Sequence, residues 1–119
     1  MKLEIDRIPE AGNIEKERVV LKAKEDVDIG KYVLMRSKRG ASGNPLSGSK
    51  SAYWLPDLMV KSGDLVVIYS KKGKSSKKTL DTGKVVHFYY WHLNKAIWDK
   101  ESNNTAVLLN VREWEHQAP

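Results

Sequence analysis

Residues 84–93 read KVVHFYYWHL, and valine or an aromatic side chain occupies six of these ten positions. β-Branched and aromatic side chains fit a pleated strand, so this stretch predicts a β-strand. Successive side chains of a strand point to opposite faces, so the even-numbered residues share one face and the odd-numbered residues share the other. Both faces are bulky. We therefore expect one face in a hydrophobic core and the other partly covered by a loop.

The histidines in and beside this run raise the question of a metal site. Zinc ligands converge on one point, but His87 and His92 face opposite sides of a strand and lie roughly 16 Å apart along it. No serine lies in a nucleophile elbow. We therefore expect no metal site, no catalytic residue and no cofactor. A base-stacking platform is an alternative interpretation, which requires Trp91 or Tyr89 to be exposed.

Further stretches have the composition of strands and are separated by Gly, Ser, Asn and Asp, which favour turns. These stretches are residues 18–24, 31–37, 52–56, 64–70 and 105–114. Six or seven short strands with almost no helix predict an all-β fold, either a sandwich or a barrel. The length of 119 residues indicates one domain, residues 1–119, with one core.

The composition narrows the classes of function. The chain has no cysteine, which excludes a disulfide framework and thiolate chemistry. It begins without an apolar run of signal-peptide length, and no stretch reaches the roughly 18 apolar residues of a membrane-spanning helix. We expect a cytoplasmic protein without membrane contact, or an extracytoplasmic one if the sequence is part of a longer chain.

Five motifs follow one another in a distinctive order. Residues 3–12, LEIDRIPEAG, combine a strand with a turn, and residues 15–23, EKERVVLKA, place a glutamate before a strand. Residues 27–34, VDIGKYVL, contain an Asp-hydrophobic-Gly-x-aromatic-x-Leu step. Residues 53–70, YWLPDLMVKSGDLVVIYS, join an aromatic-x-Pro segment to a turn glycine and an aliphatic strand. Residues 97–109, IWDKESNNTAVLL, contain a tryptophan, a polar turn and a Thr-Ala-x-Leu strand.

In this order and spacing the motifs resemble the lamin tail domain family, over about Leu3 to Glu113. The resemblance implies an immunoglobulin-like β-sandwich of about seven strands, with Trp98 as a core anchor. The chain looks like a stand-alone member of prokaryotic type, because it has no coiled-coil rod. The family often has Gly-Asp where this chain has Asn103-Asn104, and asparagine tolerates the left-handed turn conformation that glycine supplies.

The resemblance implies a non-catalytic module that binds protein partners, with no catalytic residues to carry over and with the partner and oligomeric state open. An exposed apolar or aromatic patch would favour this function. An enzyme would instead require a pocket with convergent titratable groups, and the sequence shows no such constellation.

The distribution of charge suggests a second function. The formal net charge is +6, and ten basic residues with one acid fall in two Gly/Ser-rich segments, residues 36–50 and 70–84. The ten are Arg36, Lys38, Arg39, Lys50, Lys71, Lys72, Lys74, Lys77, Lys78 and Lys84. They fit solvated loops that keep the protein soluble, or contacts to the phosphates of a nucleic acid or another polyanion.

Strand direction predicts where these two segments lie. Strands joined by short connections usually run antiparallel, so both segments are expected to leave the same end of the molecule. They would then form one cationic end, with Tyr53 and Trp54 nearby. The alternative to protein binding is therefore weak, sequence-independent DNA or RNA binding that falls steeply with salt.

Overall fold

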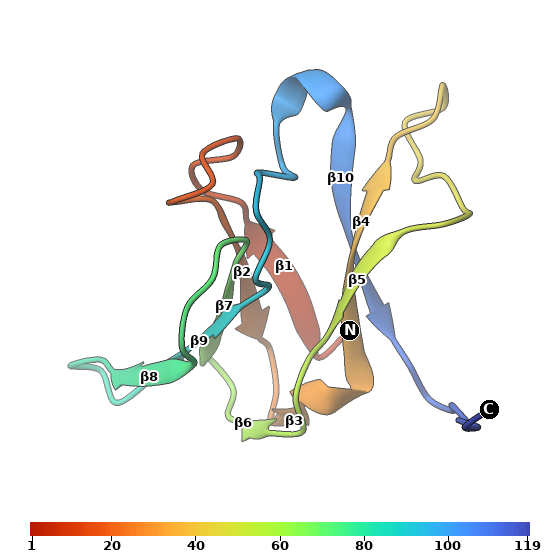
Figure 1. Cartoon of the computed structure of the whole chain (residues 1–119). Helices are drawn as coiled ribbons and strands as arrows, with labels where there is room; N and C mark the ends of the chain where they lie inside the picture. The colour runs from red at the N-terminus through yellow and green to blue at the C-terminus, as the bar shows by residue number, and fades with distance from the viewer.

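Nearly all regular structure in the chain is β-strand, as Figure 1 shows for the computed structural model, which describes all 119 residues, Met1–Pro119. The strands are β1 (Leu3–Arg7), β2 (Arg18–Ala23), β3 (Val27–Asp28), β4 (Tyr32–Lys38), β5 (Ser51–Trp54), β6 (Met59–Val60), β7 (Leu65–Tyr69), β8 (Ser76–Thr79), β9 (Val85–Tyr90) and β10 (Asn104–Asn110). Two 3₁₀ turns, η1 (Ile29–Lys31) and η2 (Lys100–Ser102), are the only helical elements. The expectation of an all-β protein is confirmed, although there are ten strands and not about seven.

The strands form two main sheets and one small ribbon. The five-stranded sheet has the order β1-β2-β7-β9-β8, and the three-stranded sheet has the order β10-β4-β5. The ribbon of β3 and β6 lies at the lower end of the molecule in Figure 1. Neighbouring strands are antiparallel except β7 and β9, which are parallel. Parallel neighbours need a crossover connection, and here that connection contains β8.

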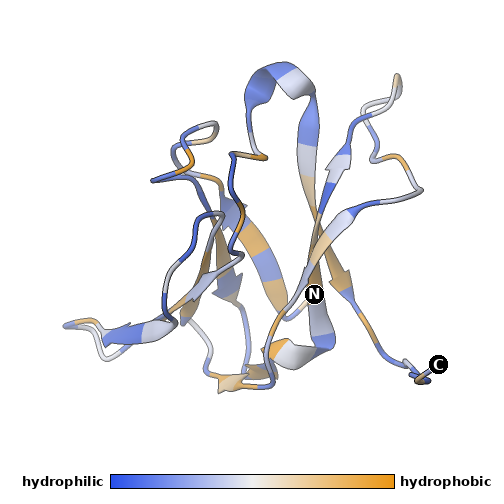
Figure 2. Cartoon of the chain, viewed as in Figure 1, coloured by the Kyte–Doolittle hydropathy of each residue, from blue (hydrophilic) through white to orange (hydrophobic).

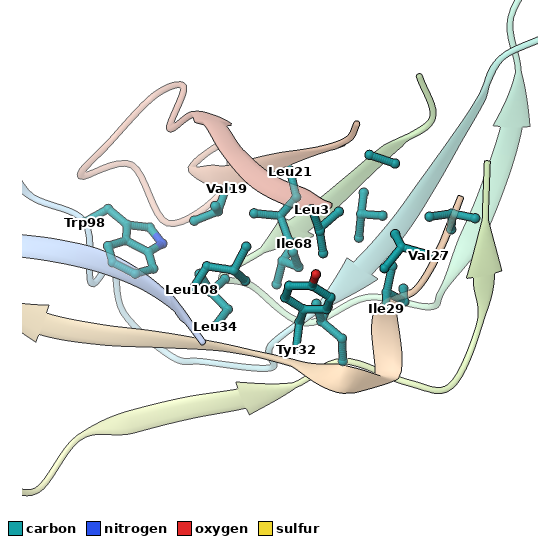
Figure 3. Packing of buried hydrophobic residues seen from close by; sticks show 14 residues of the cluster. Leu3, Val19, Leu21, Val27, Ile29, Tyr32, Leu34, Ile68, Trp98 and Leu108 are labelled. Carbon is teal, nitrogen blue, oxygen red and sulfur yellow. The ribbon is translucent and has the colours of Figure 1, made fainter. Parts of the chain in front are cut away.

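Side chains from both sheets fill one core. Val19 and Leu21 share one face of β2 and are fully buried, whereas Val20 and exposed Lys22 point to the other face. Figure 3 shows that they face Leu34 on β4 and Leu108 on β10 across the core. Each sheet therefore buries one face against the other, which is how period-two alternation stabilises a β-protein.

The aromatic run on β9 serves both faces of its sheet. Tyr89 packs against the main core, whereas Val86 belongs to a smaller cluster with Val20 and Val67 on the opposite face. On that opposite face the loop after β7 approaches closely, because a Cβ added to Gly73 would lie 2.3 Å from the Tyr90 ring. The expectation of one core face and one loop-covered face is confirmed.

Trp98 closes one end of the core, as expected. Its side chain is 5% exposed, and Figure 3 shows it beyond Leu108 at the edge of the cluster. The Trp91 ring packs edge-on against it at a centroid distance of 6.3 Å. After Trp98 in the sequence, the chain turns at Asn103, whose backbone is left-handed with a φ of 59°. Asparagine thus adopts the conformation expected of it at this turn.

A buried carboxylate holds Trp98 in place. Glu17 is fully buried, and its Oε2 accepts hydrogen bonds from the backbone N–H of Ile97 at 2.9 Å and from the hydroxyl of Ser70. Its Oε1 accepts from the N–H of Gly12 at 3.0 Å and of Trp98 at 3.4 Å. Buried charge is costly unless it is hydrogen-bonded, and here four donors satisfy the carboxylate. Two of the segments that supply them, at Ser70 and at Ile97 and Trp98, are distant in the sequence.

A second carboxylate organises the ribbon end. Asp28 Oδ1 accepts from the N–H of Gly30 at 2.9 Å and from the N–H of Leu58 at 3.2 Å. Residue 30 must be glycine, because a Cβ there would lie 2.1 Å from Asp57 Oδ1. The Gly30 carbonyl in turn accepts from Trp54 Nε1 at 2.8 Å. The Asp-x-Gly motif therefore fixes the crossing from the ribbon into β4.

We expect the substitution Glu17→Gln to lower the free energy of unfolding by about 2–3 kcal/mol, because the new amide N–H₂ opposes backbone donors that are buried without an alternative acceptor. Glu15→Gln is the matched control, since Glu15 is exposed and contacts only Lys71, at 3.9 Å. Urea unfolding of both variants measures the difference. Equal stabilities for the two variants would contradict the role assigned to Glu17.

Candidate functional site

The ten basic residues do not form one cationic end. Residues 36–38 belong to β4, so the loop proper begins at residue 39. The segment 70–84 is not one loop, because β8 lies within it and pairs with β9. The chain leaves β7 at the same end of the molecule as it leaves β4, but it then returns along the edge of the five-stranded sheet (Figure 1).

The return strand separates the lysines. Lys77 and Lys78 are exposed on β8, which is a sheet edge, and Figure 2 shows β8 as largely hydrophilic. Lys84 lies at the opposite end, where its Nζ donates to the carbonyl oxygen of Ser62 at 2.9 Å. The sequence did not predict β8 because Ser-Lys-Lys-Thr is polar on both faces, although lysine is common on exposed edge strands. The prediction that both segments leave the same end of the molecule is confirmed, whereas the prediction that all ten basic residues gather at that end is wrong.

Most of these basic side chains have no acidic partner. Lys71 alone among the ten forms an ion pair, with its Nζ 3.9 Å from Glu15 Oε2. Its Nζ also lies 5.3 Å from the centre of the Tyr69 ring, which stacks on Tyr90. A stack flanked by a cation is a plausible contact for a base or another ring. Tyr89 is instead packed on the core, as Trp91 is, so the platform considered from the sequence is not exposed.

The outer face of the three-stranded sheet is apolar, which the sequence analysis did not predict. On the two adjacent strands, Trp54 and Leu109 lie opposite Val33 of β4. Ala52 and Val107 lie opposite Met35 of β4 in the same way. Paired residues point to the same side of a sheet, and Leu34 on β4 points the other way, into the core. We call this surface the apolar sheet face: Val33, Met35, Ala52, Trp54, Val107 and Leu109.

Much of the apolar sheet face is open to solvent. Trp54 is 51% exposed and Leu109 is 38% exposed. Within the chain, Trp114 from the C-terminal segment packs edge-on against Trp54, at 5.1 Å between ring centroids, and is itself 62% exposed. None of the larger cavities of the protein is lined by this face, so it is flat.

The signal for this face was present in the sequence. The segment TAVLL (Thr105–Leu109) and the segment YVLM (Tyr32–Met35) carry apolar residues on both faces of their strands. A strand whose second face meets solvent normally alternates with polar residues. Continuous apolar strands at the side of the molecule therefore indicate a second contact surface.

The three histidines lie apart from one another. His87 Nε2 is 3.8 Å from Asp64 Oδ2 on the core side of β9, His92 is exposed in a left-handed turn, and His116 lies near Trp114. No group of three or more His, Asp or Glu side chains converges as metal ligands do. Desolvation by burial holds the pKa of His87 below 6.5, although the nearby Asp64 carboxylate opposes this shift.

Comparisons with known proteins do not identify a family. No protein-family model matches the chain, and no curated protein has a significantly similar sequence. No helix in the structure has the length and apolar character that crossing a membrane requires.

The pKa of His87 predicts how stability depends on pH. Because the folded-state pKa is lowered from 6.5, the unfolded chain takes up the proton first as pH falls. The contribution of His87 to stability is therefore fully present above pH 6.5, and it is lost as pH falls through the lowered folded-state pKa. We expect urea unfolding at about pH 7.5 and about pH 5 to show a smaller loss for His87→Gln than for the wild type. An identical loss of stability in both proteins would disprove the role of His87 in this pH dependence.

Proposed function

We propose that the chain is a non-catalytic interaction module of the lamin tail type that binds a protein partner through its apolar sheet face. The finer fold belongs to the same proposal, as an immunoglobulin-like β-sandwich. Its support is that two sheets enclose one core and that the motifs of the resemblance meet in space. Glu17 binds the Trp98 backbone, and Asp28 caps Gly30.

The observation that carries the proposal is a contiguous apolar surface on three adjacent strands. Soluble proteins seldom leave a large apolar patch exposed unless it makes a contact. The aromatic pair Trp54 and Trp114 lies at its border, and tryptophan is enriched among residues that dominate binding energy. Small-molecule sites are concave, whereas this face is flat. A flat apolar surface of this kind suits the surface of another protein.

A charge placed on the apolar sheet face tests the proposal. We expect Leu109→Lys to remove partners captured from the extract of the source cells, because an unpaired ammonium resists desolvation at an interface. Leu80→Lys is the matched control, since Leu80 is 37% exposed and Leu109 is 38% exposed. Quantitative affinity capture with the wild type and both variants gives the comparison.

A partner kept by Leu80→Lys and lost by Leu109→Lys supports binding through the apolar sheet face. An identical set of partners for all three proteins excludes it. Sedimentation of the purified wild type and of Leu109→Lys shows whether a second copy of the chain is the partner.

Polyanion binding is a second candidate function, favoured by the unpaired lysines around β8. Lys72, Lys74, Lys77 and Lys78 are exposed and lack ion pairs. They follow one edge of the five-stranded sheet, beside the Tyr69 and Tyr90 stack. Lysines in such a row contact phosphates without reading a base sequence.

We expect weak DNA or RNA binding whose affinity falls linearly with the logarithm of salt concentration, because binding releases counterions. Neutralising Lys71, Lys72, Lys77 and Lys78 together, as glutamines, should weaken it more than neutralising the exposed lysines 2, 16, 22 and 61. Fluorescence anisotropy with labelled single strands and duplexes gives both results. Undetectable binding at low salt, or equal effects of the two quadruple variants, would defeat this candidate.

A further inference from the structure

A cavity of about 540 Å³ opens between the upper end of the three-stranded sheet and the segment that leads from β9 to β10. Its lining includes the basic residues Arg36, Lys38 and Lys95 and a single acid, Asp99. None of the three basic side chains takes part in an ion pair. The cavity is therefore lined by more positive than negative charge.

The one acid in the cavity already has partners. Asp99 Oδ2 accepts from the hydroxyl of Ser102, and its Oδ1 accepts from Asn104 Nδ2 at 3.3 Å. Lys38 Nζ donates to the carbonyl oxygen of Ser102 at 2.9 Å, a neutral acceptor. A neutral group therefore orients Lys38, and the pKa of Asp99 is lowered mainly by the Ser102 hydrogen bond, with a smaller contribution from the charge of Lys38. Arg36 and Lys95 have no acidic partner.

Arg36 lies at the centre of this arrangement. Register places it between Ala106 on β10 and Ser51 on β5, and these two short side chains leave room for the guanidinium. Its Nε is buried and has no hydrogen-bond partner. A buried donor without an acceptor costs free energy, and a bound ion or water is one way in which a native structure supplies the acceptor.

A second cavity next to β4 is also lined by basic residues. It measures about 180 Å³ and is lined by Arg36, Ser37, Lys38, Ser49 and Lys50, with no acid and no apolar residue. Arg36 and Lys38 line both cavities. Cationic and hydroxyl groups therefore lie beside these two side chains in both cavities.

We propose that Arg36 and Lys38, with Lys95, form a binding site for the phosphate group of a small phosphate monoester. The guanidinium fork matches two phosphate oxygens, and the ammonium groups add charge. A volume of about 540 Å³ lies within the range of small-ligand sites. The site is separate from the apolar sheet face and from the lysines of β8, so neither proposed function is needed for it.

The test is a titration of the ¹⁵N-labelled full chain at constant ionic strength, first with inorganic phosphate and then with glycerol 1-phosphate against plain glycerol. We expect a saturating shift of the Arg36 Nε–H signal with both phosphates and none with glycerol. Arg36→Lys keeps the charge but loses the fork, so its affinity, followed by the amide signals of residues 94–97, should fall by about tenfold. Lys38→Met should weaken binding in the same assay.

The Lys77→Met and Lys78→Met double variant is the control, because it removes two charges outside the site. Phosphate affinity unchanged in this variant and reduced in the two site variants supports the site. Shifts that never saturate, that chloride reproduces, or that survive Arg36→Lys and Lys38→Met undiminished overturn it. Leu109→Lys retains phosphate binding if the site is independent of the apolar sheet face, and a loss in this variant overturns the separation.

Discussion

The buried carboxylate of Glu17 is the contact on which the arrangement of the two sheets depends. It stands at the start of β2, in the five-stranded sheet, and it accepts from the backbone of Ile97 and Trp98 in the segment that leads to the three-stranded sheet. Without those acceptors the loop that positions Trp98 has buried N–H groups and no partners. The core side chains are apolar and not directional, whereas this carboxylate fixes direction and register.

The sequence predicted the strands whose side chains alternate or are strongly apolar, because burial determines those patterns. Strands β2, β7 and β9 lie within predicted stretches, and β4 and β10 each extend one residue beyond theirs. It did not predict β8, which is exposed on every residue and is held as a strand by hydrogen bonds to β9 and not by its own composition. The sequence also did not predict the parallel pairing of β7 with β9. This pairing arises because β9 lies between β7 and β8, and both of these strands precede it in the chain.

The candidate surfaces were likewise only partly predictable from the sequence. The residue types were visible in the sequence, so the lysines and arginines were identified correctly as the excess charge. Their grouping depends on strand order, and one unpredicted strand was enough to separate Lys84 from Arg36. The apolar sheet face was missed for a different reason. A continuous apolar strand is typical of a core, but in a two-layer protein only one face of each strand reaches the core.

The long separation between Glu17 and its donors has a consequence for the growing chain. The bonds to Ile97 and Trp98 span 80 and 81 residues, and β10, which pairs along the whole of β4, is the last strand of the chain. When the chain is synthesised in order, Val19, Leu21 and Leu34 are therefore present before Trp98 and Leu108, which complete the core. Strands β1 to β9 lack these contacts until residues 97–110 have been synthesised. We therefore expect the two layers to pack together in one late step and not in successive independent steps.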